Sequence, residues 1–405
     1  MVAPGQAAGR VDMETCAGCH SRRENLTDGN PLPGTPYHDS YTLAILQEGQ
    51  YHPDGQILDE VYVYGSFLQS KMYARGVTCV NCHDPHRADL RASGNAVCTQ
   101  CHSPAGNADF PALRRAEYDS PDHHHHQPGS PGAQCKSCHM AERVYMGIDG
   151  RRDHSFRIPR PDLADQSRSP DACTDCHSDR APAWAAAAIA GWFPDSDRRG
   201  PHFGTVIAQG RAAPAAAADD LRALALDPGQ PGIARATALY LLQGQADADL
   251  ARATAPLLGA ADPLLRAHAA VLQRGAAPDL RARRLLPALT DPILSVRIAA
   301  ARAMLDIPPQ AQADWQGSLT LRLDYPETHL VLGGMALSLR NARAAEAAFG
   351  EVVRLDPQRA EAWPILVRIT RVTRGDAAAR AVLRAGLSAL PDHPGLRRLA
   401  AELGG

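Results

Sequence analysis

The stretch Cys79-Val-Asn-Cys82-His83 carries the pattern that decides how the first half of this chain is built. Two cysteines separated by two residues and followed directly by histidine occur five times, which uses all 10 cysteines. The five motifs, numbered here in chain order, are Cys16-Cys19-His20, Cys79-Cys82-His83, Cys98-Cys101-His102, Cys135-Cys138-His139 and Cys173-Cys176-His177. This spacing is typical of c-type haem attachment, in which both thiols form thioethers and the histidine ligates the iron. The sequence therefore predicts five covalently bound c-type haems.

Two other uses of cysteine compete with this interpretation. Paired cysteines also bind structural zinc, and cysteines of exported proteins form disulfides. Zinc sites use such pairs two at a time, so five pairs would leave one over. Neither use requires a histidine after every second cysteine, whereas haem attachment does. Haem is therefore the favoured interpretation.

Residues 1–180 contain every motif and are predicted to form a loop-rich pentahaem cytochrome domain. The segment is rich in Pro, Gly, His and Asp, and aromatic residues make up only 5% of the whole chain. We expect porphyrin to replace much of the ordinary core, with short helices over 41–48 and 58–73. The second and third motifs begin 19 residues apart, at Cys79 and Cys98. That is too little chain for separate domains, so their haems are predicted to be neighbours.

The second half of the 405-residue chain is rich in Ala, Leu and Arg with helical periodicity. Residues 181–212 are expected to form a connecting helix and loop. Over 213–310, Arg235, Arg266 and Arg297 recur at 31-residue intervals in similar helical segments, each preceded by an Asp-Pro pair. This pattern is typical of short HEAT-like repeats, in which each helix pair buries its apolar face against the next.

Residues 318–405 carry a second periodic pattern. The stretch 330–357 ends in Leu-Asp-Pro, and Pro391 follows Pro357 by 34 residues, the period of tetratricopeptide repeats. The predicted fold class is therefore mainly α, a loop-rich multihaem domain followed by an α-solenoid of helix-pair repeats. An irregular helical bundle is the alternative.

The second axial ligand decides whether a haem iron is saturated and suited to electron transfer or open for chemistry. Isolated histidines among haem-binding loops are candidates, and His86 and His154 are the first two. The run 123–126 precedes the fourth motif, and we expect His124 or His126 to ligate. Methionines are weaker candidates because histidines suffice in number.

Four stretches together resemble exported bacterial multihaem c-type cytochromes related to the cytochrome c554 group, with C-terminal HEAT or tetratricopeptide repeats. They are 54–70, 76–86, 126–130 and 151–162. The resemblance implies that His52 and His202 are further second ligands, ahead of His38. Such proteins typically carry a signal peptide and more haem motifs upstream, so we expect the chain to be truncated at its N-terminus. The Cys-x-x-Cys-Lys motif of related nitrite reductases does not occur here.

Charge and hydropathy argue against nucleic-acid binding and against a membrane-spanning segment. The net charge is −2, and the sequence shows no basic stripe of the kind that binds nucleic acid. No apolar run is long enough to span a membrane. Covalent haem attachment implies export to the periplasm or beyond, although residues 1–15 lack the apolar core of a signal peptide.

Any catalysis would have to occur at haem, because the phosphate-loop, nucleophile-elbow and HExxH motifs do not occur in the sequence. The favoured hypothesis is an electron-transfer protein whose haems form a chain and whose repeats dock redox partner proteins. The alternative is a multihaem oxidoreductase acting on a small nitrogen or sulfur compound at an open haem. A binding protein with purely structural haem is a third, weaker hypothesis.

Overall fold

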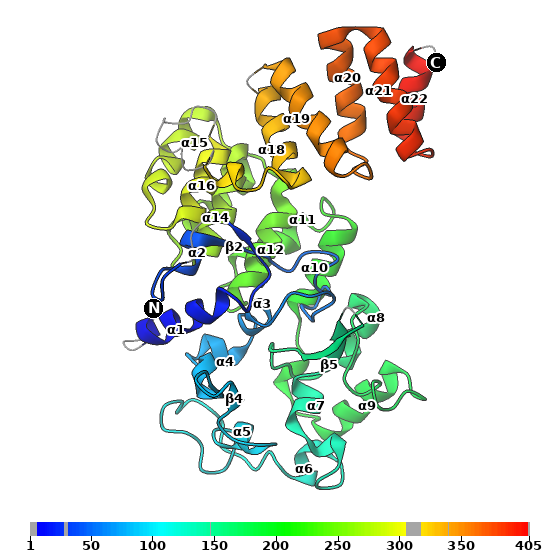
Figure 1. The fold of residues 1–405 in the computed structure, drawn as a ribbon. Coiled ribbons are helices and arrows are strands. Elements are labelled where there is room, and N and C mark those ends of the chain that lie inside the picture. Colours follow the sequence, from blue (N-terminus) through cyan, green and yellow to red (C-terminus); the bar gives the residue numbers. More distant parts are fainter. Residues whose placement is uncertain (1–5, 28–30, 146, 305–316, 339, 404–405) are drawn as a thin grey trace. The chain divides into compact units, whose positions relative to one another are not determined.

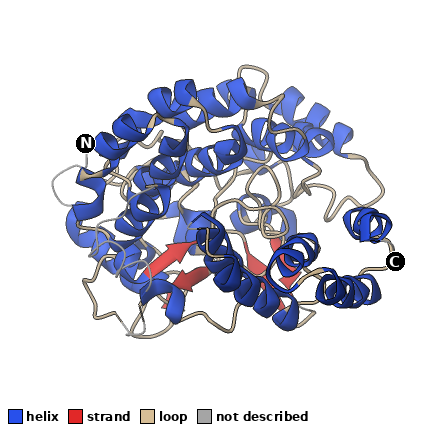
Figure 2. Ribbon diagram, turned by 90° about the horizontal axis from the view of Figure 1, so that it is seen from above, coloured by secondary structure: helices blue, strands red, loops and turns tan. Residues whose placement is uncertain are grey.

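The computed structural model describes residues 6–27, 31–145, 147–304, 317–338 and 340–403. The described chain is mainly helical, with a few short strands (Figure 2). It divides into two compact units, Met1–Trp315 and Gln316–Gly405, which are described separately. None of the described helices is long and apolar enough to cross a membrane.

The motif-bearing segment is built from short helices joined by long loops. Its helices are α1 (Gln6–Ala17), α2 (Tyr37–Ser40), α3 (Tyr64–Phe67), α4 (Lys71–Ala74), α5 (Ala96–Thr99), α6 (Pro121–His124), α7 (Cys135–His139), α8 (Ala164–Ser167) and α9 (Pro182–Trp192). Its strands pair as antiparallel two-stranded sheets: β1 (Arg23–Asn25) with β2 (Tyr41–Leu43), β3 (His83–Asp84) with β4 (Asp89–Leu90), and β5 (Glu142–Tyr145) with β6 (Asp149–Arg152).

The helix expected over 41–48 is wrong, because this stretch begins with strand β2. Tyr41 and Leu43 are both buried on one face of the strand, and Thr42 between them is half-buried. Aromatic and β-branched residues favour such a half-buried, pleated surface. The stretch 58–73 does contain helix, as the separate short helices α3 and α4.

Seven helices of 7 to 10 residues, joined by short connections, follow in the described part of the first unit (Figure 1). They are α10 (Phe203–Ala212), α11 (Ala218–Leu226), α12 (Gly232–Leu241), α13 (Ala248–Thr254), α14 (Pro263–Leu272), α15 (Pro278–Leu285) and α16 (Leu294–Ala303). The recurring arginines have a shared structural role, since each donates a hydrogen bond to a carbonyl in the preceding helix end or turn. Arg235 reaches Ala225 O at 3.0 Å, Arg266 reaches Ala260 O at 2.8 Å and Arg297 reaches Asp291 O at 2.9 Å. The arginines that recur every 31 residues thus bind carbonyls at helix ends and turns, where no helical amide is available as a donor.

One apolar core joins the start of the chain to these helices. Its buried side chains run from Met13 to Leu272 and include Tyr51 and Leu239. Polar contacts support the same packing: the Leu46 amide donates to Thr237 Oγ1 at 3.0 Å. Residues on both sides of the expected 181–212 connection therefore share a core.

The second unit is a series of helices, each of which packs on the next. They are α18 (Pro326–Ser338), α19 (Ala342–Leu355), α20 (Ala362–Arg374), α21 (Asp376–Ala389) and α22 (Pro394–Leu403). Helices α18 and α19 approach closely at Gly333, where a Cβ would lie 2.7 Å from the Phe349 ring. Between α20 and α21, Gly386 similarly leaves room for Trp363. The boundary expected at 310–318 falls largely on residues outside the described ranges.

Candidate functional site: motif histidines and their partners

In the first, third and fifth motifs, the backbone forms a turn that brings the histidine close to the first cysteine. The amides of His20, His102 and His177 each donate to the carbonyl of the first cysteine of their motif at 2.9 Å. Residues four apart in such a turn lie on one face, so the first thiol and the imidazole project together. All ten cysteines are free. The turn therefore fits the two thioethers and the single axial ligand that a c-type haem requires.

Three motif histidines face a second histidine. The ring centroids of His83 and His154 are 6.4 Å apart, those of His139 and His123 are 6.2 Å apart, and those of His177 and His126 are 6.1 Å apart. Two metal–nitrogen bonds of about 2.0 Å each, with the ring radii added, separate two axial imidazoles by about 6 Å. Each pair is therefore spaced to hold one iron between its rings.

Hydrogen bonds from Nδ1 prepare several of these rings for ligation. His139 Nδ1 donates to Arg157 O at 2.5 Å, His154 Nδ1 to Arg152 O at 2.9 Å and His126 Nδ1 to His124 O at 2.5 Å. A carbonyl can only accept, so Nδ1 carries the proton and Nε2 is left to bind metal. Burial also lowers the pKa of His139 and of His154. Both effects favour the neutral imidazole that ligates iron.

The four histidines of the His123–His126 run have different neighbours in the structure. His126 faces a motif histidine, whereas His124 accepts the His126 amide at 3.1 Å and supports that ring through its carbonyl. His125 stacks on Trp192 with the centroids 4.1 Å apart. His123, which sequence reasoning did not select, lies opposite His139. The run itself was the only sequence signal, and it does not say which member points where.

The other predicted second ligands lie elsewhere. His86 is exposed in a turn, where its amide donates to Asp84. His52 is half-buried, and burial lowers its pKa. His202 caps α10, because its Nδ1 accepts the Gly204 amide at 3.0 Å, and burial with the nearby Arg157 lowers its pKa to about 4. In the described chain no ring contact joins these three to a motif histidine, so their ligation stays a prediction.

The remaining two motif histidines, His20 and His102, contact no second histidine ring in the described chain. His20 borders a small cavity that Tyr62, Tyr145 and Arg151 also line. The His102 ring packs edge-on against Tyr118, with the centroids 5.8 Å apart. Tyr118 in turn contacts His123 at 5.2 Å, so it lies between the third and fourth motifs.

Cysteines of consecutive motifs lie close enough to affect one another's ionisation. Burial, together with the nearby Cys16, raises the pKa of Cys79 to about 12. The nearby Cys135 is the largest cause that raises the pKa of Cys98, and burial adds to it. Burial raises the pKa of Cys82 and of Cys138, with smaller contributions from Cys101 and Cys176. Each motif is thus near the next one along the chain.

The segment that carries the second and third motifs has no buried apolar side chain. Between Phe67 and Ala133, all of whose intervening residues are described, only residues near the start, from Leu68 to Cys79, pack half-buried against the main core. A folded segment of this length normally needs apolar burial to offset its conformational entropy. Covalently held porphyrin would supply that apolar interior.

Comparison with known proteins agrees with this chemistry. A family model described as "Doubled CXXCH motif" matches residues 71–107, which contain the second and third motifs. The motifs and this match support a multihaem c-type cytochrome.

A solved structure titled "Crystal Structure of Outer Cell Wall Cytochrome OcwA" is similar over 68% of this chain, at 18% identity and a TM-score of 0.34. The similar region spans 65% of that protein's length, which is less than two thirds. Comparison with curated protein sequences gives no match.

Proposed function

We propose that this protein carries electrons along five covalently bound haems arranged in the order of their motifs. The observation that supports it most directly is the proximity of cysteines of consecutive motifs, which influence one another's ionisation. Each thiol would be a thioether at the edge of its porphyrin. Neighbouring thiols therefore imply neighbouring haem edges, and short edge separations are what electron transfer requires.

The facing histidines support conduction over catalysis. An iron with two imidazole ligands has no vacant position for substrate, and such coordination leaves the reduction potential low. His154, His123 and His126 would complete the coordination of the second, fourth and fifth haems. Second ligands for the first and third haems would come from the remaining predicted set, His52, His86, His124 and His202.

The helices after residue 203 would serve as the docking region for a redox partner outside the cytoplasm. Helix pairs stacked in series form extended surfaces that repeat proteins use for binding. We propose that the paired helices within each unit form such a solenoid, HEAT-like before residue 304 in the first unit and tetratricopeptide-like after residue 317 in the second.

A second candidate function rests on the cavity beside His20. Its lining residues include Tyr62, Tyr145, Arg151 and Arg152, together with one carboxylate residue, Glu60, which pairs with Arg151 at 3.8 Å. If the first haem lacks a second protein ligand, the phenol and guanidinium groups could hold a small nitrogen or sulfur oxyanion near its iron. The protein would then be an oxidoreductase at that haem.

Electron paramagnetic resonance of the oxidised protein separates the two proposals. For a conductor we expect a mass five haems above the polypeptide, low-spin signals only, and no turnover of nitrite or hydroxylamine. A high-spin haem that binds nitric oxide and turns over either compound would contradict conduction and support the enzyme. Colourless protein containing zinc would contradict both.

A further inference from the structure

One short loop supports imidazoles that belong to different haems. Arg152 O accepts the Nδ1 hydrogen bond of His154, which faces His83 of the second motif. Five residues later, Arg157 O accepts the Nδ1 hydrogen bond of His139, the histidine of the fourth motif. The Arg157 amide donates back to His139 O at 3.0 Å. The position of the 152–157 backbone therefore sets the orientation of one ring at each of two haems.

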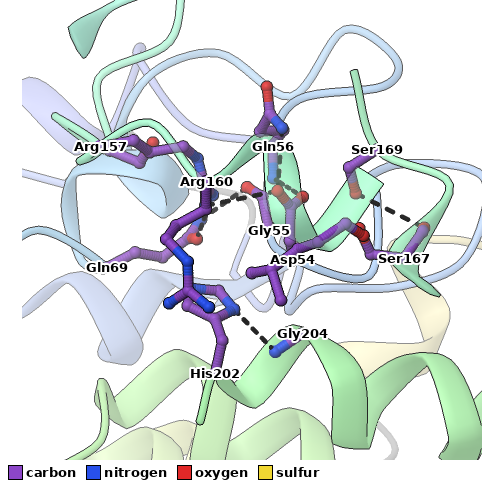
Figure 3. A network of polar contacts seen from close by, with 12 residues as sticks. Asp54, Gly55, Gln56, Gln69, Arg157, Arg160, Ser167, Ser169, His202 and Gly204 are labelled. Carbon is purple, nitrogen blue, oxygen red and sulfur yellow. Dashed lines mark hydrogen bonds and ion pairs between the residues drawn. The ribbon is translucent and has the colours of Figure 1, made fainter. Parts of the chain in front are cut away.

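The side chain of Arg157 anchors this loop to a distant part of the chain. Its guanidinium pairs with Asp54 at 3.8 Å and donates to Gln69 Oε1 at 3.0 Å (Figure 3). It also pairs with Asp153 at 3.9 Å. These charged groups are almost enclosed, with 18% of the arginine side chain and 8% of each aspartate side chain exposed. A buried charge that loses its partner is strongly destabilising, so this arrangement resists displacement.

The partners of Arg157 are themselves fixed. Gln69 donates to Gly55 O at 3.0 Å, and a Cβ at Gly55 would lie only 2.0 Å from the Gln69 side chain. Asp153 accepts the amide of Ile57 at 3.3 Å, and the Ile57 side chain is part of the buried core. Displacement of the loop would therefore require movement of the core-packed segment 54–69.

We propose that Arg157 is a positioning residue for the second and fourth haems, acting through the carbonyls of Arg152 and Arg157. The proposal rests on the haem ligation of His154 and His139 proposed above. A hydrogen bond to Nδ1 orients a ligating imidazole and raises its basicity. A more basic ligand favours ferric over ferrous iron, so the anchored loop holds both reduction potentials low.

Charge-conserving variants test this role, because removal of the arginine charge would itself alter nearby potentials. Gln69→Leu removes one contact of the Arg157 fork, and Arg157→Lys replaces the fork by a single ammonium. We expect both variants to bind all five haems, and to show raised midpoint potentials and altered low-spin signals for two of them. The affected signals should be those that become high-spin in His154→Ala and His123→Ala. The haem of the fifth motif, between His177 and His126, should keep its potential.

Arg266→Lys is the matched control, since Arg266 also pairs through two hydrogen bonds with a buried carboxylate, Asp291, far along the sequence. It should leave every potential unchanged. Unchanged potentials in Gln69→Leu, or an equal shift of all haems, would overturn the proposal. Failure of the ligation scheme itself would be visible in the wild type, as high-spin haem at the second or fourth motif. If Arg157→Lys loses haem, Gln69→Leu alone decides.

Discussion

Residues 68–132 and residues 317–403 have opposite internal organisation. The first segment buries no apolar side chain, although some near its start pack half-buried against the main core, and its helices and strands are only two to four residues long. The second consists of helices of 10 to 14 residues in its described part. Its helices bury Phe349, Trp363 and Leu396 against one another. Thus one segment requires an interior supplied from outside the polypeptide, while the other supplies its own.

The difference is already present in the side-chain pattern. Helices α19 and α20 place small and large apolar residues on one face, as with Ala345, Phe349 and Val352 on α19. Such a face buries itself by packing on a neighbouring helix. The segment 68–132 has no comparable face. Its main sequence feature is instead its two Cys-x-x-Cys-His motifs.

Loss of a haem should unfold the first segment and spare the second. In the double variant Cys98→Ala, Cys101→Ala the third haem can no longer be attached. We expect residues 68–132 to lose amide protection in hydrogen-exchange mass spectrometry, above all beyond Cys79, because no buried apolar side chain of the segment fills its interior. Residues 317–403 should keep their protection. The matched double variant at Cys173 and Cys176 should affect 68–132 much less, and full protection there in the first variant would contradict the contrast.

A cavity made in residues 317–403 should destabilise that segment and leave the haem-binding segment unchanged. Phe349→Ala removes a ring that is 3% exposed and contacts Gly333 across α18. We expect the free energy of unfolding of residues 317–403 to fall by about 3–5 kcal/mol. Denaturant unfolding followed by far-UV circular dichroism measures this, and the haem absorbance should not change. Val372→Ala, at a side chain that is 80% exposed, should stay within about 0.5 kcal/mol of the wild type.

A ligand variant should change one haem without unfolding either segment. His123→Ala removes the ring that faces His139, so one of the five haems should convert from low-spin to high-spin. His124→Ala is the matched control in the same helix, because in this structure His124 supports His126 through its backbone carbonyl. Electron paramagnetic resonance distinguishes the outcomes. If only His124→Ala converted a haem to high-spin, His124, as predicted from the sequence, would be the ligand, and His123, as indicated by the ring geometry, would not.

The motifs and the later helices could be predicted from sequence because both depend on local spacing. The arginines at 31-residue intervals and the turns of the Cys-x-x-Cys-His motifs are of this kind. His154 could be nominated because it is isolated among loops, and the structure places it opposite His83.

What could not be predicted depends on distant partners. His123 and His126 are separated in role because α6 ends at His124 and His125 adopts a left-handed φ of 54°. The His123 ring lies beside Phe193 and the His126 ring beside His177, both far along the chain. Strand β2 likewise needs Arg23–Asn25 as its partner, and the sequence of 41–48 does not contain that information.

The smallest effect concerns acid stability of the second segment. Glu346 on α19 has a side chain that is 9% exposed and is paired with Arg374 at 2.7 Å. It accepts hydrogen bonds from Thr373 at 2.6 Å and from Thr370 at 3.2 Å. Burial alone would raise the pKa of Glu346, but the contacts with Thr373 and Arg374 outweigh it and hold this pKa below its ordinary value.

The folded state therefore binds the Glu346 proton more weakly than the unfolded state does. Its contribution to stability is complete above the unfolded pKa of about 4.3 and is lost as the pH falls through the lower folded pKa. Glu346→Gln should cost about 1 kcal/mol at pH 7 and should flatten the decline in unfolding free energy below pH 4.3. Denaturant titrations of the helix signal at a series of pH values measure both effects. Glu402→Gln, at an exposed position on α22, should keep the wild-type slope, and the same slope in Glu346→Gln would show that the buried contacts do not hold the carboxylate ionised.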